Sequence, residues 1–327
     1  MSRALITGGA GFIGAHLAER LVREGLEVDL VDDFSRAVHD AELASLESSA
    51  KVRVLQRDLR LPGALDDLDD PYRYVVHLAA IVGVGRVVRQ PSAVLGDSVT
   101  MLRNVVAAAA RQPTPPRLVF LSTSEVYAGT LASFTLRFPT PESTPLTITE
   151  LAQPRTAYML SKIYGEAMCH YAGVPFTILR PHNVYGPRMG LSHVIPELLQ
   201  RAHAAVSGGR LEVASVDHRR TFCHIDDAVE MIWRAASSPS CTGETLNIGV
   251  SEPEVSIGEL AALIGTTVGK RVEIVALPPT PGSPPRRCPD MTRTRALTGY
   301  DPQVGLASGI RDTYDWYRTQ VFDAAIR

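Results

Sequence analysis

The chain has 327 residues, of which 45% are hydrophobic and 21% are charged, and its formal net charge is −2. This length fits one large domain or two smaller ones that share a cleft. A pI near 6.5 gives no reason to expect binding to nucleic acids or to anionic membranes. The four cysteines lack C-x-x-C spacing, which argues against a disulfide framework and a zinc site, so no metal is expected.

The chain starts almost directly with a strand-like run, at Arg3–Thr7. No charged and apolar leader precedes this run, and we find no stretch of about 20 apolar residues. We therefore expect a soluble cytoplasmic protein.

Short β-branched runs alternate with amphipathic helical stretches through the first half of the chain. This alternation is typical of a parallel sheet that is covered by helices on both faces. The predicted strands are Arg3–Thr7, Glu27–Val31, Val52–Gln56, Tyr74–His77, Leu118–Leu121 and Phe176–Leu179. The predicted helices are Phe12–Arg23, Ala93–Arg111 and Thr156–Tyr171.

The alternation weakens after Pro181. There the pattern predicts extended segments at Glu212–Ala214 and Arg220–Cys223, and helices at Val194–Val206, Asp226–Ala236, Ile257–Ile264 and Leu306–Val321. Ser256 and Glu259 have the spacing of a capping box at the start of one of these helices. A proline-dense loop, Pro278–Pro289, precedes the last helix.

A glycine-rich turn, TGGAGFIG at residues 7–14, follows the first strand and opens the first helix. Gly8, Gly11 and Gly14 are spaced as a dinucleotide site requires, because the backbone must turn tightly, approach a pyrophosphate and pack closely on the strand. The helix N-terminus adds partial positive charge at the phosphates. An ordinary βα turn is the alternative, but the flanking strand and helix favour the dinucleotide site.

Asp32 at the end of the second strand favours NAD over NADP, since a carboxylate there binds both ribose hydroxyls and repels a 2′-phosphate. Arg36 keeps NADP open as an alternative. Asp58 after the third strand suits the adenine edge, or is a solvated loop residue. The predicted cofactor-binding residues are Gly8, Gly11, Phe12, Ile13, Gly14, Asp32, Asp58, Leu59, Leu78, Ala79, Ala80, Tyr158 and Lys162.

Tyr158 and Lys162 are four residues apart and therefore lie on one face of a helix. An ammonium near a phenol lowers the pKa of the phenol, so that tyrosine can act as a base. Lys162 is also one of only three lysines among 33 basic residues. The segment LSTSEVY (121–127) follows the fifth strand, and a hydroxyl there is placed to hydrogen-bond a substrate alcohol at the carboxyl edge of the sheet, although such clusters also form ordinary turns.

These motifs, together with HLAA (77–80), STSEVY (122–127), RPHNVYGPR (180–188), RTFCHIDD (220–227), NIG (247–249) and RRCPD (286–290), resemble the extended short-chain dehydrogenases/reductases that act on nucleotide sugars. The resemblance covers nearly the whole chain and is greatest to the UDP-glucuronate decarboxylases, which include UDP-xylose synthases. It implies a doubly wound Rossmann sheet over residues 1–180, joined again by 224–250, and a smaller, interleaved nucleotide-sugar-binding part over 181–223 and 251–327.

The resemblance also assigns roles. Thr123, Tyr158 and Lys162 form the oxidation set, and Ser124, Glu125 and Arg287 lie at the C5–C6 end of the sugar. The substrate-binding residues are Asn183, Arg188, Arg220 and Arg287, with Asn183 and Arg220 on the diphosphate. The helices Ala93–Arg111 and Thr156–Tyr171 are similar to those of the four-helix interface of the family, which implies a homodimer.

The implied reaction starts when Tyr158 removes the proton of the sugar C4 hydroxyl while NAD takes the hydride. The resulting 4-keto group is β to the C6 carboxylate, so loss of carbon dioxide leaves a stabilised enolate. Glu125 or a bound water returns a proton at C5, and NADH returns the hydride at C4, which regenerates the cofactor.

Three alternatives stay open. A 4-epimerase returns the hydride to the opposite face of the 4-keto sugar, and a dehydratase uses Glu125 as a base at C5 and expels the 6-hydroxyl. Arg287 favours a carboxylated substrate and hence the decarboxylase. The alternative from another class is an NAD-binding regulatory protein on the same fold, which the presence of both Tyr158 and Lys162 disfavours.

Overall fold

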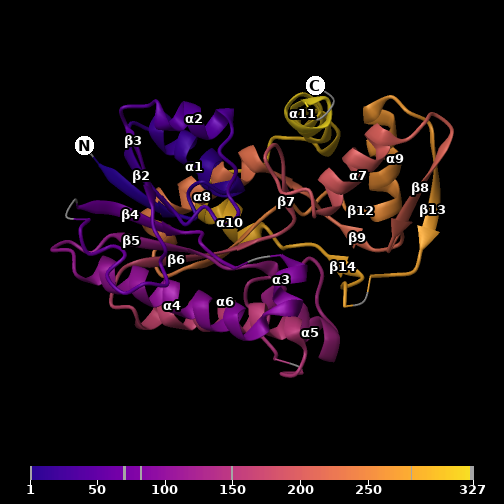
Figure 1. The fold of residues 1–327 in the computed structure, drawn as a ribbon. Helices are drawn as coiled ribbons and strands as arrows, with labels where there is room; N and C mark the ends of the chain where they lie inside the picture. Colours follow the sequence, from indigo (N-terminus) through magenta and orange to yellow (C-terminus); the bar gives the residue numbers. More distant parts are fainter. Residues whose placement is uncertain (1, 69–70, 82, 149, 281, 325–327) are drawn as a thin grey trace.

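The structure is a computed structural model that describes residues 2–68, 71–81, 83–148, 150–280 and 282–324 (Figure 1). Its central sheet has seven parallel strands in the order β11-β6-β5-β4-β1-β2-β3. The strands are β1 (Arg3–Thr7), β2 (Glu27–Asp32), β3 (Val52–Gln56), β4 (Tyr72–His77), β5 (Arg117–Leu121), β6 (Phe176–Pro181) and β11 (Thr245–Ile248). The first six follow the order of the doubly wound Rossmann sheet, so the predicted fold class is confirmed.

Helices cover both faces of this sheet because successive side chains of each strand point to opposite sides. Ile6 and Leu30 face the core beneath α1 (Phe12–Arg23) and α8 (Ile225–Ser237). Leu5 and Val75 face the opposite core beneath α4 (Pro91–Ala110) and α6 (Pro154–Tyr171). Figure 1 shows these two helical layers on either side of the strands. Two shorter helices complete the layers, α2 (Ala41–Glu47) and α3 (Val84–Arg89).

The predicted elements of the first half agree with the observed ones to within two residues. Both α4 and α6 begin two residues before the predicted start, at Pro91 and Pro154. Proline is well tolerated in the first turn of a helix, where its missing N–H would have no partner in any case.

The second part of the chain has its own core, to which Leu199, Leu260 and Ile310 contribute. It is built by α7 (Val194–Ala204), α9 (Ile257–Val268), α11 (Leu306–Tyr317) and the parallel pair β8 (Gly209–Ala214) and β13 (Val272–Leu277). The Ser256–Glu259 capping box at the start of α9 is confirmed. A turn of π-helix at Arg318–Phe322 follows α11.

The predicted extended segment Arg220–Cys223 is not one strand. Two short strands replace it, β9 (Arg219–Arg220) and β10 (Cys223–His224), which pair with different partners. β9 lies between β12 (Val255–Ser256) and β14 (Arg286–Arg287), whereas β10 pairs with β7 (Val184–Tyr185). The chain therefore crosses from one small sheet to another at Thr221 and Phe222.

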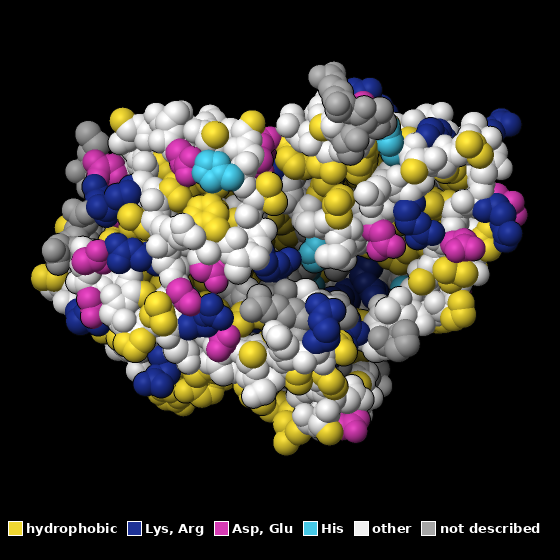
Figure 2. Space-filling view, in the orientation of Figure 1, with side chains coloured by type: hydrophobic (Ala, Val, Ile, Leu, Met, Phe, Trp, Pro, Cys, Tyr) yellow, Lys and Arg dark blue, Asp and Glu magenta, His cyan; other side chains and the backbone are white. Residues whose placement is uncertain are grey.

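The chain returns to the Rossmann sheet after residue 223. β11 pairs with β6, and α8 packs on α1. A short helix, α10 (Thr292–Thr298), also packs on α8 and β11. The division into the two parts predicted from the sequence remains a proposal. Figure 2 shows the molecular face hollowed between the Rossmann sheet and the second part, with basic side chains inside the hollow.

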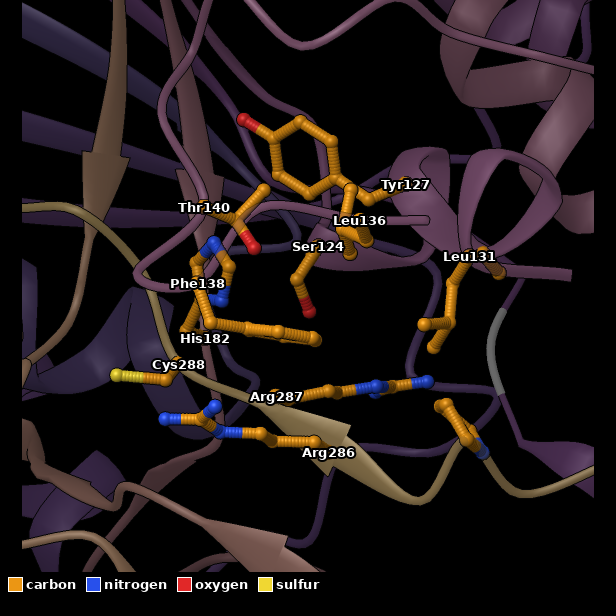
Figure 3. Close-up of a pocket in the computed structure, with 12 residues that line it drawn as sticks. Ser124, Tyr127, Leu131, Leu136, Phe138, Thr140, His182, Arg286, Arg287 and Cys288 are labelled. Atoms are coloured by element: carbon orange, nitrogen blue, oxygen red, sulfur yellow. The ribbon is translucent and has the colours of Figure 1, made fainter. Parts of the chain in front are cut away.

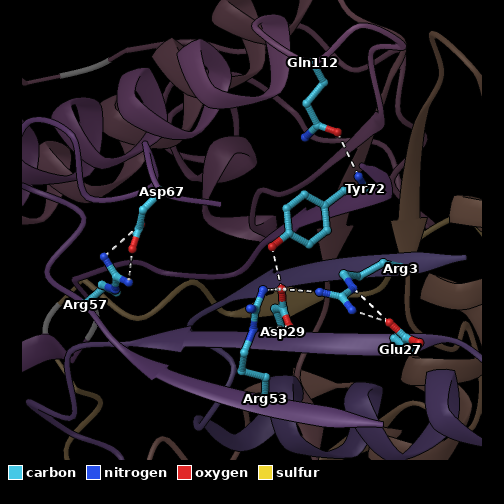
Figure 4. Close-up of polar contacts among 8 residues, drawn as sticks. All are labelled: Arg3, Glu27, Asp29, Arg53, Arg57, Asp67, Tyr72 and Gln112. Carbon is cyan, nitrogen blue, oxygen red and sulfur yellow. Dashed lines mark hydrogen bonds and ion pairs between the residues drawn. The ribbon is translucent and has the colours of Figure 1, made fainter. Parts of the chain in front are cut away.

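A buried carboxylate anchors one edge of the sheet. Asp29 on β2 accepts two hydrogen bonds from Arg53 on β3, at 3.0 and 2.6 Å, and one from the hydroxyl of Tyr72, at 2.5 Å (Figure 4). Arg3 lies 3.8 Å from the same carboxylate. These bonds join β1, β2, β3 and β4 away from the carboxyl ends of the strands, so they are structural.

By length and composition alone, α4 is also apolar enough to cross a membrane, although the sequence pattern did not indicate such a run. It contains Asp97 and Arg103, and it packs on α6 and β4. A core helix of a globular protein meets the same criterion, so this is weak evidence for a membrane span.

Candidate active site

The glycine turn has the close approaches that a dinucleotide site requires. Gly8 has a φ of +69°, and a Cβ on it would lie 2.8 Å from the amide nitrogen of Ala79. A Cβ on Gly14 would lie 2.4 Å from the carbonyl oxygen of Gly8. Larger residues at either position would force the turn away from the strand end, so the backbone geometry fits a cofactor phosphate at the start of α1.

Several of the predicted cofactor-binding residues lie around this turn. The carboxylate of Asp32 accepts hydrogen bonds from the amides of Ala10, at 3.2 Å, and Phe34, at 2.9 Å, so it lies beside the turn. Leu78 and Ala79 bond to Thr7 at the end of β1, through the amides of both residues. Ala80 follows them, and Phe12 and Ile13 pack on the core beneath α1.

Asp58 and Leu59 lie farther along the same edge of the sheet. The carboxylate of Asp58 is held by the guanidinium of Arg60, at 2.7 and 2.8 Å, and this ion pair lowers the pKa of Asp58. Leu59 is buried in the core beneath α4. The position of Asp58 is therefore compatible with an adenine contact. The side chain of Leu59, in contrast, packs in the core.

The oxidation set converges at the carboxyl ends of β5 and the start of α6. Thr123 follows β5 and caps the short 3₁₀ turn η1 (Ser124–Tyr127) through its hydroxyl. It also hydrogen-bonds the half-buried Tyr158. The ammonium of Lys162 is buried, donates to the carbonyl oxygen of Leu121 at 2.7 Å and lies 6.0 Å from the Tyr158 ring centre.

The electrostatics of Tyr158 differ from the expectation. Burial raises the pKa of Tyr158 to about 12, although the hydrogen bond with Thr123 acts to lower it. Burial also lowers the pKa of Lys162, to about 8, and its ammonium donates to the carbonyl oxygen of Leu121. The role of Tyr158 as a base assisted by Lys162 therefore stays a prediction.

Glu125 and Arg287 form an ion pair across 162 residues of sequence, at 2.6 Å. Burial acts to raise the pKa of Glu125, but the positive charges of Arg287, Arg155 and Arg220 outweigh it, so the pKa lies below its usual value. Arg220 is buried, and desolvation together with the charge of Arg287 lowers its pKa to about 10. This basic cluster around one carboxylate suits an anionic ligand.

Ser124 and Arg287 line a small cavity of about 20 Å³ with His182, Phe138 and Leu136 (Figure 3). In Figure 3 the Ser124 hydroxyl points toward β14, on which Arg286 and Arg287 extend in opposite directions. Arg286 is bound instead by both carboxylate oxygens of Glu254. The structure thus brings Ser124, Glu125 and Arg287 together at one end of the oxidation set.

Asn183 and Arg188 lie outside this cluster. The side-chain amide of Asn183 donates to the carbonyl of Thr221 at 2.9 Å, and its φ is +41°. Arg188 reaches the other way, to Asp40 at 2.6 Å and toward the glycine turn. The motif RPHNVYGPR therefore supplies side chains to two different regions of the cleft.

The sequence did not reveal a role for His182. Its Nε2 bonds the Oδ1 of Asn247 at 3.0 Å, and the amide group of Asn247 donates to the carbonyls of Thr140 and Asp290. Since Oδ1 can only accept, the proton of His182 is on Nε2, and Nδ1 is a buried acceptor without a partner among the described residues. Burial lowers the pKa of His182 to about 3, so the ring is neutral. The only feature of the sequence that pointed to His182 was its position within the RPHNVYGPR motif.

The described residues contain no group of three or more His, Cys, Asp or Glu side chains that could hold a metal ion. The fold, the glycine turn and the Tyr158–Lys162 pair together define an enzyme built around a dinucleotide. The comparisons with known proteins give the family.

Residues 4–249 match the NAD dependent epimerase/dehydratase family. A UDP-N-acetyl-alpha-D-glucosaminuronate decarboxylase of Bacillus cytotoxicus is 33% identical over 97% of this chain and 98% of that protein. The structure of TunA, an NAD-dependent NDP-hexosamine 5,6-dehydratase of tunicamycin biosynthesis, is similar with a TM-score of 0.82 and 28% identity, over 99% of this chain and 100% of that one.

A third similar protein is a UDP-glucuronic acid 4-epimerase from Bacillus cereus, whose structure contains UDP-glucuronic acid and NAD. It has a TM-score of 0.80 and 25% identity, over 97% of this chain and 99% of that one. The chain belongs to the NAD dependent epimerase/dehydratase family and is an enzyme that uses NAD and a nucleotide-sugar substrate. The non-enzymatic alternative is thereby set aside.

Proposed function

We propose that the chain decarboxylates a UDP-linked uronic acid, either UDP-glucuronate or its 2-acetamido relative. The observation that carries this proposal is the Glu125–Arg287 ion pair beside Ser124, at one end of the oxidation set. A guanidinium binds a sugar carboxylate through two parallel donors, and its charge does not depend on pH. The similarity to the Bacillus cytotoxicus decarboxylase supports the same reaction class.

The roles of the residues follow from their surroundings. Tyr158 accepts the proton of the sugar C4 hydroxyl, Thr123 orients that hydroxyl, and Lys162 supplies positive charge on the far side of the phenol. NAD, when bound at the glycine turn, supplies the hydride acceptor and donor at C4. Asn183 and Arg220 are proposed to hold the diphosphate of the substrate.

Glu125 stays ionised beside three arginines. A carboxylate in this state cannot itself donate a proton to C5 of the enolate. Of the two routes that the sequence left open, its charge therefore favours a water molecule, oriented by Glu125, as the proton donor. An incoming sugar carboxylate would compete with Glu125 for Arg287, which would free Glu125 for this task.

The ionised Glu125 also suits a dehydratase, in which it would take the C5 proton as a base. Analysis of the products separates the alternatives when the protein is incubated with NAD and either UDP-uronate. Decarboxylation gives carbon dioxide and a lighter sugar nucleotide, and epimerisation gives a product of unchanged mass. Dehydration needs the 6-hydroxyl that a uronate lacks, so the same assay with a UDP-hexose tests it and gives a product lighter by one water.

Arg287 and Arg286 form a matched pair for mutation, since they are adjacent on β14 but point in opposite directions. Arg287→Met is expected to lower kcat/KM for a UDP-uronate by a factor of about 10² or more, because hydrogen bonds between charged groups are lost. Arg286→Met loses the ion pair with Glu254 and the contact with the Phe138 ring, and it is expected to keep activity within a factor of about three. Equal losses in both variants would contradict the role of Arg287.

We also propose the homodimer that the resemblance implies, with α4 and α6 of each subunit in a four-helix interface. The two helices pack on one another, and α4 leaves Gly96, Arg103 and Ala107 exposed on its outer side. On α6, Tyr164 and Tyr171 are exposed. Apart from Arg103, these residues are small or aromatic, which suits helix–helix contact. The cytoplasmic location stays a prediction.

A further inference from the structure

Arg188 has an unusual backbone and an unusual environment. Its φ is +65°, in the left-handed region that residues with a Cβ rarely adopt. Only 5% of its side chain is exposed, although it belongs to a loop between β7 and α7. A strained backbone that directs a charged side chain into the protein indicates a functional constraint.

The guanidinium of Arg188 joins the N-terminus of α2 to the glycine turn. Its Nε donates to the carboxylate of Asp40 at 2.6 Å, and its Nη2 donates to the carbonyl oxygen of Ala10 at 3.5 Å. Ala10 lies inside the glycine turn, between Gly8 and Gly11. Arg188 therefore places a positive charge at the turn whose backbone amides face a phosphate.

The third nitrogen of the guanidinium, Nη1, is buried and has no hydrogen-bond partner among the described residues. A buried donor without an acceptor is unfavourable, and such a group is expected to meet one in the working enzyme. Beside the glycine turn of an NAD-dependent enzyme, the acceptor that fits is an oxygen of the cofactor's pyrophosphate.

The charges around Arg188 separate it from the substrate cluster. Burial lowers the pKa of His16 on α1, and the positive charge of Arg188 lowers it further. Arg220, in contrast, is influenced by Arg287 and Glu125. Arg188 therefore acts on a residue of α1, whereas Arg220 belongs to the cluster around Glu125, although the resemblance assigned both arginines to the substrate.

We propose that Arg188 binds the pyrophosphate of NAD rather than the diphosphate of the sugar nucleotide, and that it retains the cofactor during turnover. A reaction that oxidises and then reduces the same sugar requires the cofactor to stay bound between the two steps. The proposal rests on the NAD dependence of the family and not on the choice among decarboxylation, epimerisation and dehydration.

Two side-chain contacts join the second part of the chain to α2. Asp40 is the N-cap of α2, where one carboxylate oxygen accepts from the amide of Leu43 at 3.0 Å and the other from Arg188. Trp316 on α11 donates to Glu42 on the same helix at 2.5 Å. Both contacts tie α2 to residues that follow the first six strands of the chain.

The test measures binding, so it does not depend on activity. Arg188→Met should weaken NADH binding, measured by fluorescence titration, by about 10- to 100-fold, the range for a lost hydrogen bond to a charged group. Binding of UDP, measured by calorimetry, should stay within a factor of two of the unmodified protein. Arg220→Met is the mirror control and should weaken UDP binding while NADH binding is kept.

Unchanged NADH affinity in Arg188→Met would overturn the proposal, and so would a loss of UDP affinity equal to or larger than the loss of NADH affinity. If the methionine variant does not fold, Arg188→Gln serves the same test, because it removes the charge but keeps a polar head group. Failure of the decarboxylation assay alone would leave these binding results, and the proposal, unaffected.

Discussion

Tyr158 is the residue on which the proposed chemistry depends most directly. Its hydroxyl bonds Thr123, and burial raises its pKa to about 12, so the phenol is protonated at neutral pH. To act as a base it needs further positive charge at the moment of reaction. Lys162 and the oxidised cofactor are the sources that the proposed arrangement offers.

Tyr158→Phe is expected to lower kcat by 10²- to 10⁴-fold, the usual contribution of a positioned base, with little effect on UDP affinity. Tyr164→Phe is the control, because Tyr164 is on the same helix but 45% exposed. The steady-state rates of the two variants test whether Tyr158 is the base. If Tyr158→Phe retained the rate of the control, another residue would have to be the base.

For single residues, the sequence predicted a role most readily where the residue acts within a local motif. The pair Tyr158–Lys162 follows from helical spacing, and the Glu125–Arg287 assignment came from a family resemblance, since 162 residues separate its members. The placement of Arg188 could not be predicted. Its direction depends on a left-handed backbone turn and on Asp40, 148 residues away.

At the scale of elements, the first six strands of the central sheet were readily predicted, whereas its buried seventh strand, β11, and the two-residue strands were not. Strands β1 and β3 have the predicted ends, because each is a compact β-branched run bounded by turns. Strands β7, β9, β10 and β14 have two residues each, and only pairing with distant partners creates them. β13 escaped prediction because its side chains are half-buried or exposed, which weakens the hydrophobic pattern.

Asp29 provides a test of how the first four strands are held together. Asp29→Ala is expected to lower the free energy of unfolding by about 2–4 kcal/mol, because it leaves Arg53 and Tyr72 without their shared acceptor. Asp67→Ala removes an exposed carboxylate that pairs with Arg57 and should have no measurable effect (Figure 4). Urea denaturation of both variants compares the two pairs directly. Equal shifts would mean that the Asp29 cluster adds nothing beyond a surface ion pair.

At the scale of the whole molecule, the proposed dimer is the open question. Light scattering should give twice the chain mass of 35.4 kDa. Ala107→Glu would place a charge on the exposed side of α4 and should shift the mass toward that of one chain. Ala262→Glu, at an exposed position of α9, is the matched control and should stay dimeric. A monomeric mass for the unmodified protein would exclude this interface.

The overall arrangement explains how a nearly neutral protein can bind an anionic substrate. The charges that matter are local, because Arg220 and Arg287 lie around Glu125 and Arg188 lies at the glycine turn. The net charge of −2 says little about either site.

The most direct test of the central claim is turnover of a UDP-uronate with NAD in heavy water, followed by mass spectrometry of the product. Decarboxylation with protonation from solvent predicts a sugar nucleotide that has lost carbon dioxide and gained a single deuterium at C5, while the C4 hydrogen is returned internally from the cofactor. A product that keeps its carboxylate would contradict the proposed decarboxylase.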